Sequence, residues 1–157
     1  MAGPPPLIFL AIDPSRLTGL AWWHQDHGFH ADQCPFEQAG DWIEDTARIG
    51  GRGCRMICER YVPLPDLPQD DAHFAMEMIG VARRAALKNG CTFAEPRPGD
   101  RLIATPAMLR KIGWWMPGLK DANAASQHLL ADMLANRGYL PAAVGEAVLS
   151  DAVRTVE

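Results

Sequence analysis

A short apolar run near the start of the chain most constrains the fold. Residues 7–12 are all apolar, and Asp13 and Pro14 follow them directly. A continuous apolar run of this length predicts a central strand that is covered on both faces. Proline has no backbone N–H to offer to a sheet ladder, so the strand should end before it. The run therefore predicts a buried central strand with a carboxylate at its C-terminal end.

The rest of the chain predicts an α/β fold in one domain over residues 1–157. Further strands are expected at residues 18–23, 28–34, 54–61 and 91–94, and the first three strands should be joined as hairpins. Helical spacing of apolar residues occurs at 36–49, 70–88, 106–112 and 121–136, with a weaker helix from residue 142 onward. This order predicts a mixed five-stranded sheet with helices on both faces. Residues 1–6 are expected to be disordered.

Composition excludes several classes of protein. With 157 residues, 48% of them hydrophobic, the chain can bury a core and is not expected to be disordered as a whole. It contains no apolar run close to the roughly 20 residues of a membrane-spanning helix, and its N-terminus lacks the features of a signal peptide. We therefore expect a cytoplasmic protein with no membrane partner. The formal net charge of −4 is not globally basic, although a local basic face can accompany an acidic centre.

The histidines and cysteines do not predict a metal site. Four cysteines without a second closely spaced Cys or His pair do not make a zinc site, and they do not indicate a disulfide framework. His24, His27 and His30 are spaced by three, but their segment is predicted to form two strands around a turn. They should therefore not share a helical face, and a polar hairpin tip is the favoured interpretation.

Three carboxylates occur where strands end or helices begin. Asp13 ends the first strand, Glu59 interrupts an apolar strand, and Asp121 opens a late helix. Each has an ordinary alternative: Asp13 could start a turn, Asp121 could be a helix N-cap, and Glu59 could pair with Arg55 or Arg60. Together they can converge at one end of the sheet, where clustered carboxylates collect cations such as Mg²⁺ or Mn²⁺. Two such ions could activate a water and stabilise the leaving oxygen of a phosphodiester.

Three segments carry, in order, motifs that are found together in one group of nucleases. Residues 12–22 read Ile-Asp-Pro-Ser-Arg-Leu-Thr-Gly-Leu-Ala-Trp, residues 57–60 read Ile-Cys-Glu-Arg, and residues 113–118 read Gly-Trp-Trp-Met-Pro-Gly. The first resembles the opening strand–turn–strand of RuvC-like Holliday junction resolvases, which belong to the RNase H-like superfamily. The second resembles the second acidic strand of their phage and prophage branch. The third, together with the helix that ends in His128-Leu129-Leu130, resembles the C-terminal segment of that branch. The resemblance covers about residues 7–141.

This resemblance implies an RNase H-like fold and a homodimeric, Mg²⁺- or Mn²⁺-dependent endonuclease that cuts branched DNA such as four-way junctions. The resemblance implies that Asp13, Glu59 and Asp121 are the catalytic residues and metal ligands. It also implies that the protein acts in the cytoplasm of a bacterial or phage-infected cell. Basic residues in the loops expected to border these acids are candidates for phosphate contacts, although each could be ordinary surface charge. These are Arg16, Arg97, Arg101, Arg110, Lys111 and Lys120.

The late helix departs from the family pattern. The pattern (His/Asp)-x-x-Asp-Ala falls on residues 121–125, so Ala124 stands where the family has an acid. Asp121, one helical turn earlier, could take over metal ligation, and Asn123 could add a neutral oxygen. Ser15 also stands where the family has glycine. A second hypothesis therefore remains: a weakened module that binds branched DNA without efficient cleavage.

Two further alternatives concern other features of the chain. The segment from Asp13 to Thr18-Gly19 also resembles the phosphate-binding hairpin of sugar-kinase and actin-like ATPases, but those proteins need two lobes and a much longer chain. Trp114 and Trp115 could stack on an unpaired base, although core packing or a dimer contact is favoured.

Overall fold

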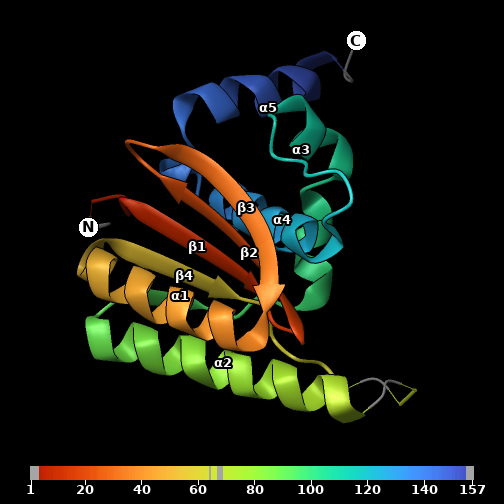
Figure 1. Ribbon diagram of the computed structural model, residues 1–157. Helices are drawn as coiled ribbons and strands as arrows, with labels where there is room; N and C mark the ends of the chain where they lie inside the picture. Colours follow the sequence, from red (N-terminus) through yellow and green to blue (C-terminus); the bar gives the residue numbers. More distant parts are fainter. Residues whose placement is uncertain (1–3, 64, 67–68, 155–157) are drawn as a thin grey trace.

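Five strands form one mixed sheet in the order β3-β2-β1-β4-β5 (Figure 1). The computed structural model describes residues 4–63, 65–66 and 69–154. The strands are β1 (Ile8–Asp13), β2 (Leu17–His24), β3 (Gly28–Pro35), β4 (Cys54–Cys58) and β5 (Thr92–Ala94). β1 pairs antiparallel with β2 and parallel with β4, so it lies at the centre of the sheet. The expected mixed five-stranded α/β architecture is confirmed.

The apolar run predicted to be covered on both faces is buried on both. Phe9 and Ala11 point into one core cluster, and Leu10 and Ile12 point into the other. All four side chains are almost completely inaccessible to solvent. Because successive side chains of a strand alternate between faces, this strand supplies apolar contacts to both layers of the domain.

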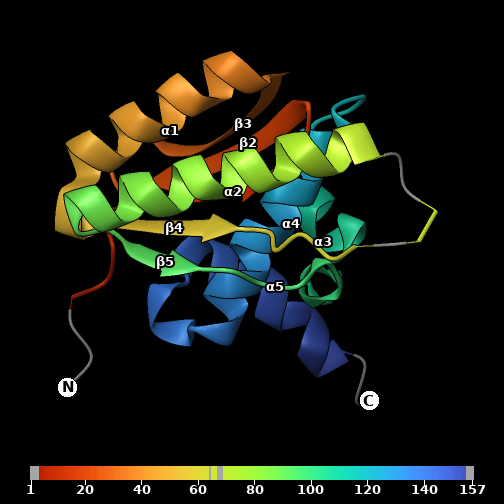
Figure 2. The same ribbon diagram turned by 90° about the horizontal axis from the view of Figure 1, so that it is seen from below.

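Helices cover both faces of the sheet (Figures 1 and 2). α1 (Phe36–Gly50) and α2 (Gln69–Asn89) pack on one face, where Ile43 and Met78 are fully buried. α4 (Lys120–Ala135) lies on the other face, with α3 and α5 packed beyond it. The shorter helical segments are α3 (Pro106–Lys111), α5 (Ala142–Arg154), and the 3-10 turns η1 (Gly51–Gly53), η2 (Pro98–Ile103) and η3 (Arg137–Tyr139).

The fourth strand ends earlier than predicted. It was expected to run through residue 61, but β4 ends at Cys58 and Glu59 is the first residue after it. The Glu59 N–H still donates to the carbonyl of Ile12 at 3.1 Å, whereas the Arg60 N–H turns to the carbonyl of Pro96 at 2.8 Å. Glu59 therefore lies at a strand end and not in the middle of a strand. The other predicted elements start and end within one or two residues of the observed ones, wherever those ends are described.

Three residues at each end of the chain lie outside the part that the structure describes. Of the six N-terminal residues expected to be disordered, residues 1–3 lie outside the described residues, and residues 4–6 form neither helix nor strand. The last predicted helix is observed as α5, and residues 155–157 lie outside the described part of the chain. None of the described helices combines the length and apolar character needed to cross a membrane.

A glycine allows α4 to approach the sheet at the point that matters for the carboxylates. Gly19 pairs with Asp13 across the β1–β2 ladder. A Cβ atom on Gly19 would lie 2.0 Å from the carbonyl oxygen of Asp121 and 2.9 Å from the backbone nitrogen of Ala122. Any side chain at this position would therefore collide with backbone, and only glycine lets the first turn of α4 lie beside the end of β1.

We expect Gly19→Ala to destabilise the chain by about 2–3 kcal/mol or more, because the clash is with backbone atoms that cannot rotate away. Urea unfolding followed by circular dichroism measures the change. Gly80→Ala is the matched control, since Gly80 is an exposed helical residue whose Cβ would meet nothing within 4 Å. It should raise stability by about 0.5–1 kcal/mol. Equal effects of the two substitutions would contradict this account of Gly19.

Candidate active site

Asp13 and Glu59 lie next to each other because β1 and β4 run parallel. Ile12 is opposite Cys58 in the ladder, so the two acidic residues follow at the same end of neighbouring strands. The backbone bond from Glu59 to Ile12 extends this pairing by one residue. Carboxyl ends of parallel strands share one edge of the sheet, and both side chains therefore emerge at that edge.

Asp121 joins them from the first turn of α4. The N-cap residue of α4 is Leu119, so Asp121 does not cap the helix, contrary to one interpretation of the sequence. Its backbone N–H donates to the side-chain oxygen of Gln33 on β3 at 3.0 Å, which helps to hold the helix start against the sheet. The structure thus brings together all three carboxylates singled out in the sequence.

A cavity of about 560 Å³ opens beside these residues. Asp13 and Asp121 bring carboxylates to its lining, and Arg101 and Lys120 bring positive charge. Ala124 also lines it, so the position where the sequence lacks an acid does face this cavity. The space is open enough to admit a polar ligand and is bordered by both signs of charge.

The other two carboxylates act electrostatically on Asp13. Burial, together with the negative charges of Glu59 and Asp121, raises the pKa of Asp13 to about 7, whereas Arg101 and Lys120 oppose the shift. Burial also raises the pKa of Asp121, with Lys120 acting in the opposite direction. Without an added cation, this arrangement therefore disfavours full ionisation of the three acids.

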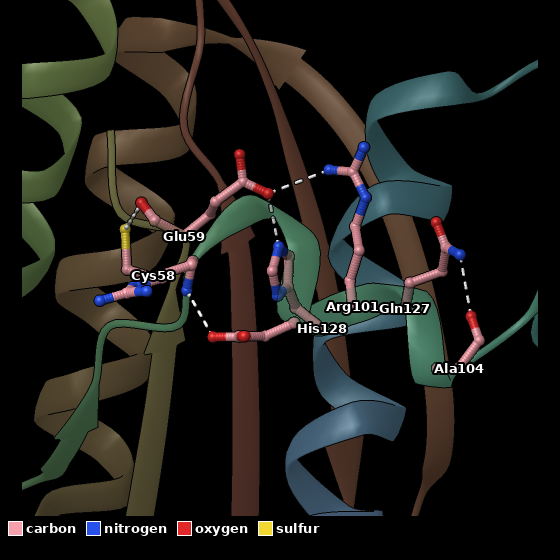
Figure 3. Close-up of polar contacts among 8 residues, drawn as sticks. Cys58, Glu59, Arg101, Ala104, Gln127 and His128 are labelled. Carbon is pink, nitrogen blue, oxygen red and sulfur yellow. Dashed lines mark hydrogen bonds and ion pairs between the residues drawn. The ribbon is translucent and has the colours of Figure 1, made fainter. Parts of the chain in front are cut away.

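Glu59 is held by two basic side chains (Figure 3). Its Oε2 accepts a hydrogen bond from Nη1 of Arg101 at 2.9 Å and lies 2.5 Å from Nε2 of His128. The sequence suggested Arg55 or Arg60 as partners, and neither forms this pair. Arg55 instead makes a two-pronged ion pair with Asp132, at 2.6 and 2.7 Å.

His128 is the site residue that sequence reasoning missed. It lies on α4 with its side chain fully buried, and its Nδ1 has no hydrogen-bond partner. It follows Asp121 by seven residues and Ala124 by four, so these three positions lie on one face of the helix. That spacing was the available signal, because a histidine two turns after a candidate ligand faces the same way.

The structure gives Asn123 and Ser15 local roles. Asn123 was expected to offer a neutral oxygen to a metal, but its side chain accepts from the N–H of Met116 and donates to its carbonyl, both at 2.8 Å. It therefore holds the loop before α4. Ser15 does not need a glycine backbone, because no described residue other than glycine has positive φ. The Ser15 carbonyl accepts a hydrogen bond from the hydroxyl of Thr18 at 2.8 Å.

The six basic candidates for phosphate contacts are distributed unevenly. Arg101 and Lys120 line the cavity. Arg110 lies over the ring of Trp115, a further cavity residue, with 4.4 Å between the guanidinium carbon and the ring centroid. The other three lie elsewhere: Arg16 over the Phe74 ring at 5.0 Å, Lys111 with its Nζ 3.4 Å from the Ser150 hydroxyl, and Arg97 exposed at the start of η2.

The tryptophans divide between core and cavity. Trp114 is buried and stacks on Phe29, with ring centroids 4.4 Å apart, so core packing is correct for this residue. Trp115 is half-buried and lines the cavity.

His24, His27 and His30 lie at the β2–β3 hairpin. Among the residues that the structure describes, no three Asp, Glu, His or Cys side chains form a preformed metal site.

The donor set nevertheless suits a hard divalent cation. Asp13 and Asp121 line one cavity, and the pKa of Asp13 is raised partly by the nearby negative charges. A cation would relieve that repulsion, and oxygen ligands are those that Mg²⁺ prefers. Glu59 contributes less freely, because two basic groups already contact its Oε2.

Comparison with known proteins supports this architecture through structure alone. No protein-family model matches the sequence, and no curated protein matches it. Among solved structures, RuvC of Thermus thermophilus in complex with a Holliday junction substrate superposes with a TM-score of 0.62 at 14% identity, over 83% of this chain and 95% of that one. The chain has a RuvC-like fold. A second Thermus thermophilus RuvC structure gives a TM-score of 0.52, also at 14% identity, over 84% of this chain and 97% of that one.

The buried carboxyl of Asp13 should make stability depend on pH. Its pKa rises from an ordinary value of 3.8 to about 7 in the folded chain, so the folded state binds the proton more tightly. The associated stabilisation is fully present below about pH 4 and is lost as the pH rises through about 7. Relative to Asp13→Asn, the wild-type free energy of unfolding should therefore fall over this range, by at most roughly 4 kcal/mol at about 1.4 kcal/mol per pKa unit.

Urea unfolding of both proteins in EDTA at several pH values measures this difference. Asp45→Asn serves as the control, because Asp45 is exposed and pairs only with the exposed Arg48 on α1 among the ion pairs described. It should retain the wild-type pH profile. Parallel pH profiles for the wild type and Asp13→Asn would show that Asp13 does not carry the effect.

Proposed function

We propose that this chain is a divalent-metal-dependent, structure-selective endonuclease that cuts branched DNA such as Holliday junctions. The observation that carries the proposal is the gathering of Asp13, Glu59 and Asp121 from two strands and a helix at one end of the sheet. A RuvC-like fold supports the substrate class, since one structure of similar fold is a RuvC bound to a Holliday junction substrate.

The residues have distinct tasks in this proposal. Asp13 and Asp121, with Glu59 beside them, would hold Mg²⁺ or Mn²⁺, and such an ion supplies charge stabilisation and activation of water for phosphodiester hydrolysis. Water adds to phosphorus, one P–O ester bond breaks, and the departing oxygen takes a proton. Arg101 and Lys120 at the cavity place positive charge where a phosphate would enter.

The remaining basic residues would act further along the DNA. Trp115 lines the same cavity with Arg110 over its ring, and the two would contact the backbone or a base near the cut. Arg16, Arg97 and Lys111 lie away from the cavity lining and would reach only more distant phosphates. We include homodimerisation in the proposal, because two strands of a junction must be cut, and we place the protein in the cytoplasm of a bacterial or phage-infected cell.

We expect a labelled four-way junction to be nicked in Mg²⁺ or Mn²⁺ and to remain intact in EDTA. Asp13→Asn should lower the cleavage rate at least about 100-fold, the scale of losing a group that stabilises transition-state charge. Its binding to the junction should persist. Asp45→Asn should cut at the wild-type rate. An Asp13→Asn protein that still cuts would remove Asp13 from the proposed chemistry.

A weakened binding module is the second candidate function. It is favoured by Ala124, which lines the cavity and offers no ligand, and by Glu59, whose Oε2 is already engaged. Such a module would bind a junction in a salt-sensitive manner without metal-dependent nicking. The same cleavage experiment separates the two functions, because tight binding without nicks supports only the module.

Ala124→Asp tests what the missing acid does. Ala124 is only 9% exposed but lines the cavity, so a carboxylate there would be added to the lining that already includes Asp13, Asp121 and Arg101. We expect cleavage to rise at least about 10-fold if a ligand is missing, since about 1.4 kcal/mol of barrier suffices. Ala143→Asp is the control for the added negative charge, because Ala143 is an exposed residue of α5. An unchanged rate for Ala124→Asp would refute the lost-ligand account.

A further inference from the structure

The contacts of Glu59 differ from those expected of an open metal ligand. Its side chain is 15% exposed, and a single oxygen, Oε2, receives both the Arg101 guanidinium and His128. His128 has a fully buried side chain, so it is fixed by the packing of α4. Arg101 is anchored on η2, which packs against the same helix. Figure 3 shows both groups converging on Glu59 from the α4 side.

Arg101 supplies a positive charge. A guanidinium offers only N–H donors and has no lone pair with which to accept a proton. At 2.9 Å it neutralises Glu59 in the way that a bound cation would. It also acts on Asp13, where its charge opposes the upward shift in pKa.

Among the described residues that line the cavity, only Asp13 and Asp121 bring carboxylates. Asp13 and Asp121 line it with their carboxylates, Ala124 brings none, and the amide of Asn123 is used by the backbone of Met116. One or two carboxylates with waters are the usual protein ligands of a single Mg²⁺. A second divalent ion at Glu59 would sit close to the guanidinium, and like charges at such distances repel strongly in a partly buried site.

We propose that Arg101 takes the place of a second cation. The site then binds one divalent ion, between Asp13 and Asp121, and Glu59 stays paired with Arg101 and His128. The inference rests on the proposed nuclease function and specifies how its acidic centre is neutralised. Arg101 would balance negative charge on a phosphate but could not activate water, so that task stays with the single ion. His128 is a positioning residue that orients Glu59.

Mn²⁺ binding to the full chain tests this without reference to activity. Electron paramagnetic resonance of free Mn²⁺ during a titration gives the number of ions bound per chain. We expect one ion for the wild type and at least a tenfold weaker affinity for Asp13→Asn. Arg101→Gln should bind two ions, because the guanidinium that competes with a second cation at Glu59 is gone, whereas Arg101→Lys should bind one, because the charge remains.

Arg83→Gln is the matched control. Arg83 also pairs with a glutamate, Glu95, but neither residue lines the cavity that contains Asp13. It should bind one ion with wild-type affinity. Two ions in the wild type, or an Arg101→Gln protein that is folded by circular dichroism and still binds one, would overturn the inference.

The outcomes also separate this inference from the proposed function. Two ions together with junction cleavage would refute the role of Arg101 and leave the nuclease intact. No bound ion in the wild type would refute both. One ion without cleavage would support the role of Arg101 and favour the binding module.

Discussion

The parallel pairing of β1 and β4 places two carboxylates side by side, and the balance of their charge governs the rest of the site. Asp13 and Glu59 leave the same sheet edge, where burial and mutual repulsion raise the pKa of Asp13 to about 7. Such a pair is tolerable only with positive charge close by. The structure supplies part of it through Arg101, and His128 contacts the same oxygen of Glu59. Asp13 and Asp121 face the cavity, and the positive charges of Arg101 and Lys120 offset their negative charge only in part.

α4 contributes both to the cluster of carboxylates and to the packing of the core. Its buried face fills the core on one side of the sheet, and Gly19 lets its first turn approach β2. The same helix therefore delivers Asp121 at its start and His128 two turns later. Displacing it would alter the ligand set and the support of Glu59 together. Folding stability and site geometry are thus coupled through one helix–sheet contact.

Much of the fold could be predicted from periodicity and turn chemistry. The apolar run of β1 and the helical spacing of α1 and α2 are local patterns, and local patterns predict which segments become strands and helices. Predictions that depended on which distant residues form hydrogen bonds or ion pairs with each other were less accurate. β4 stops at Cys58 because Arg60 bonds to Pro96, and Glu59 pairs with Arg101 in place of Arg55 or Arg60. Arg55 is taken by Asp132, 77 positions away, a distance in sequence that no local pattern reports.

Residue identity and spacing were enough to predict a buried strand that ends in an aspartate, two further acids at element boundaries, and a missing acid at position 124. The contacts of Glu59 with Arg101 and His128, and those of Asn123 with the loop before α4, became known from the folded chain. Hydrogen bonds and ion pairs form only between atoms within a few ångströms of each other. Which side chains come that close is set by how α4 and η2 pack onto the sheet.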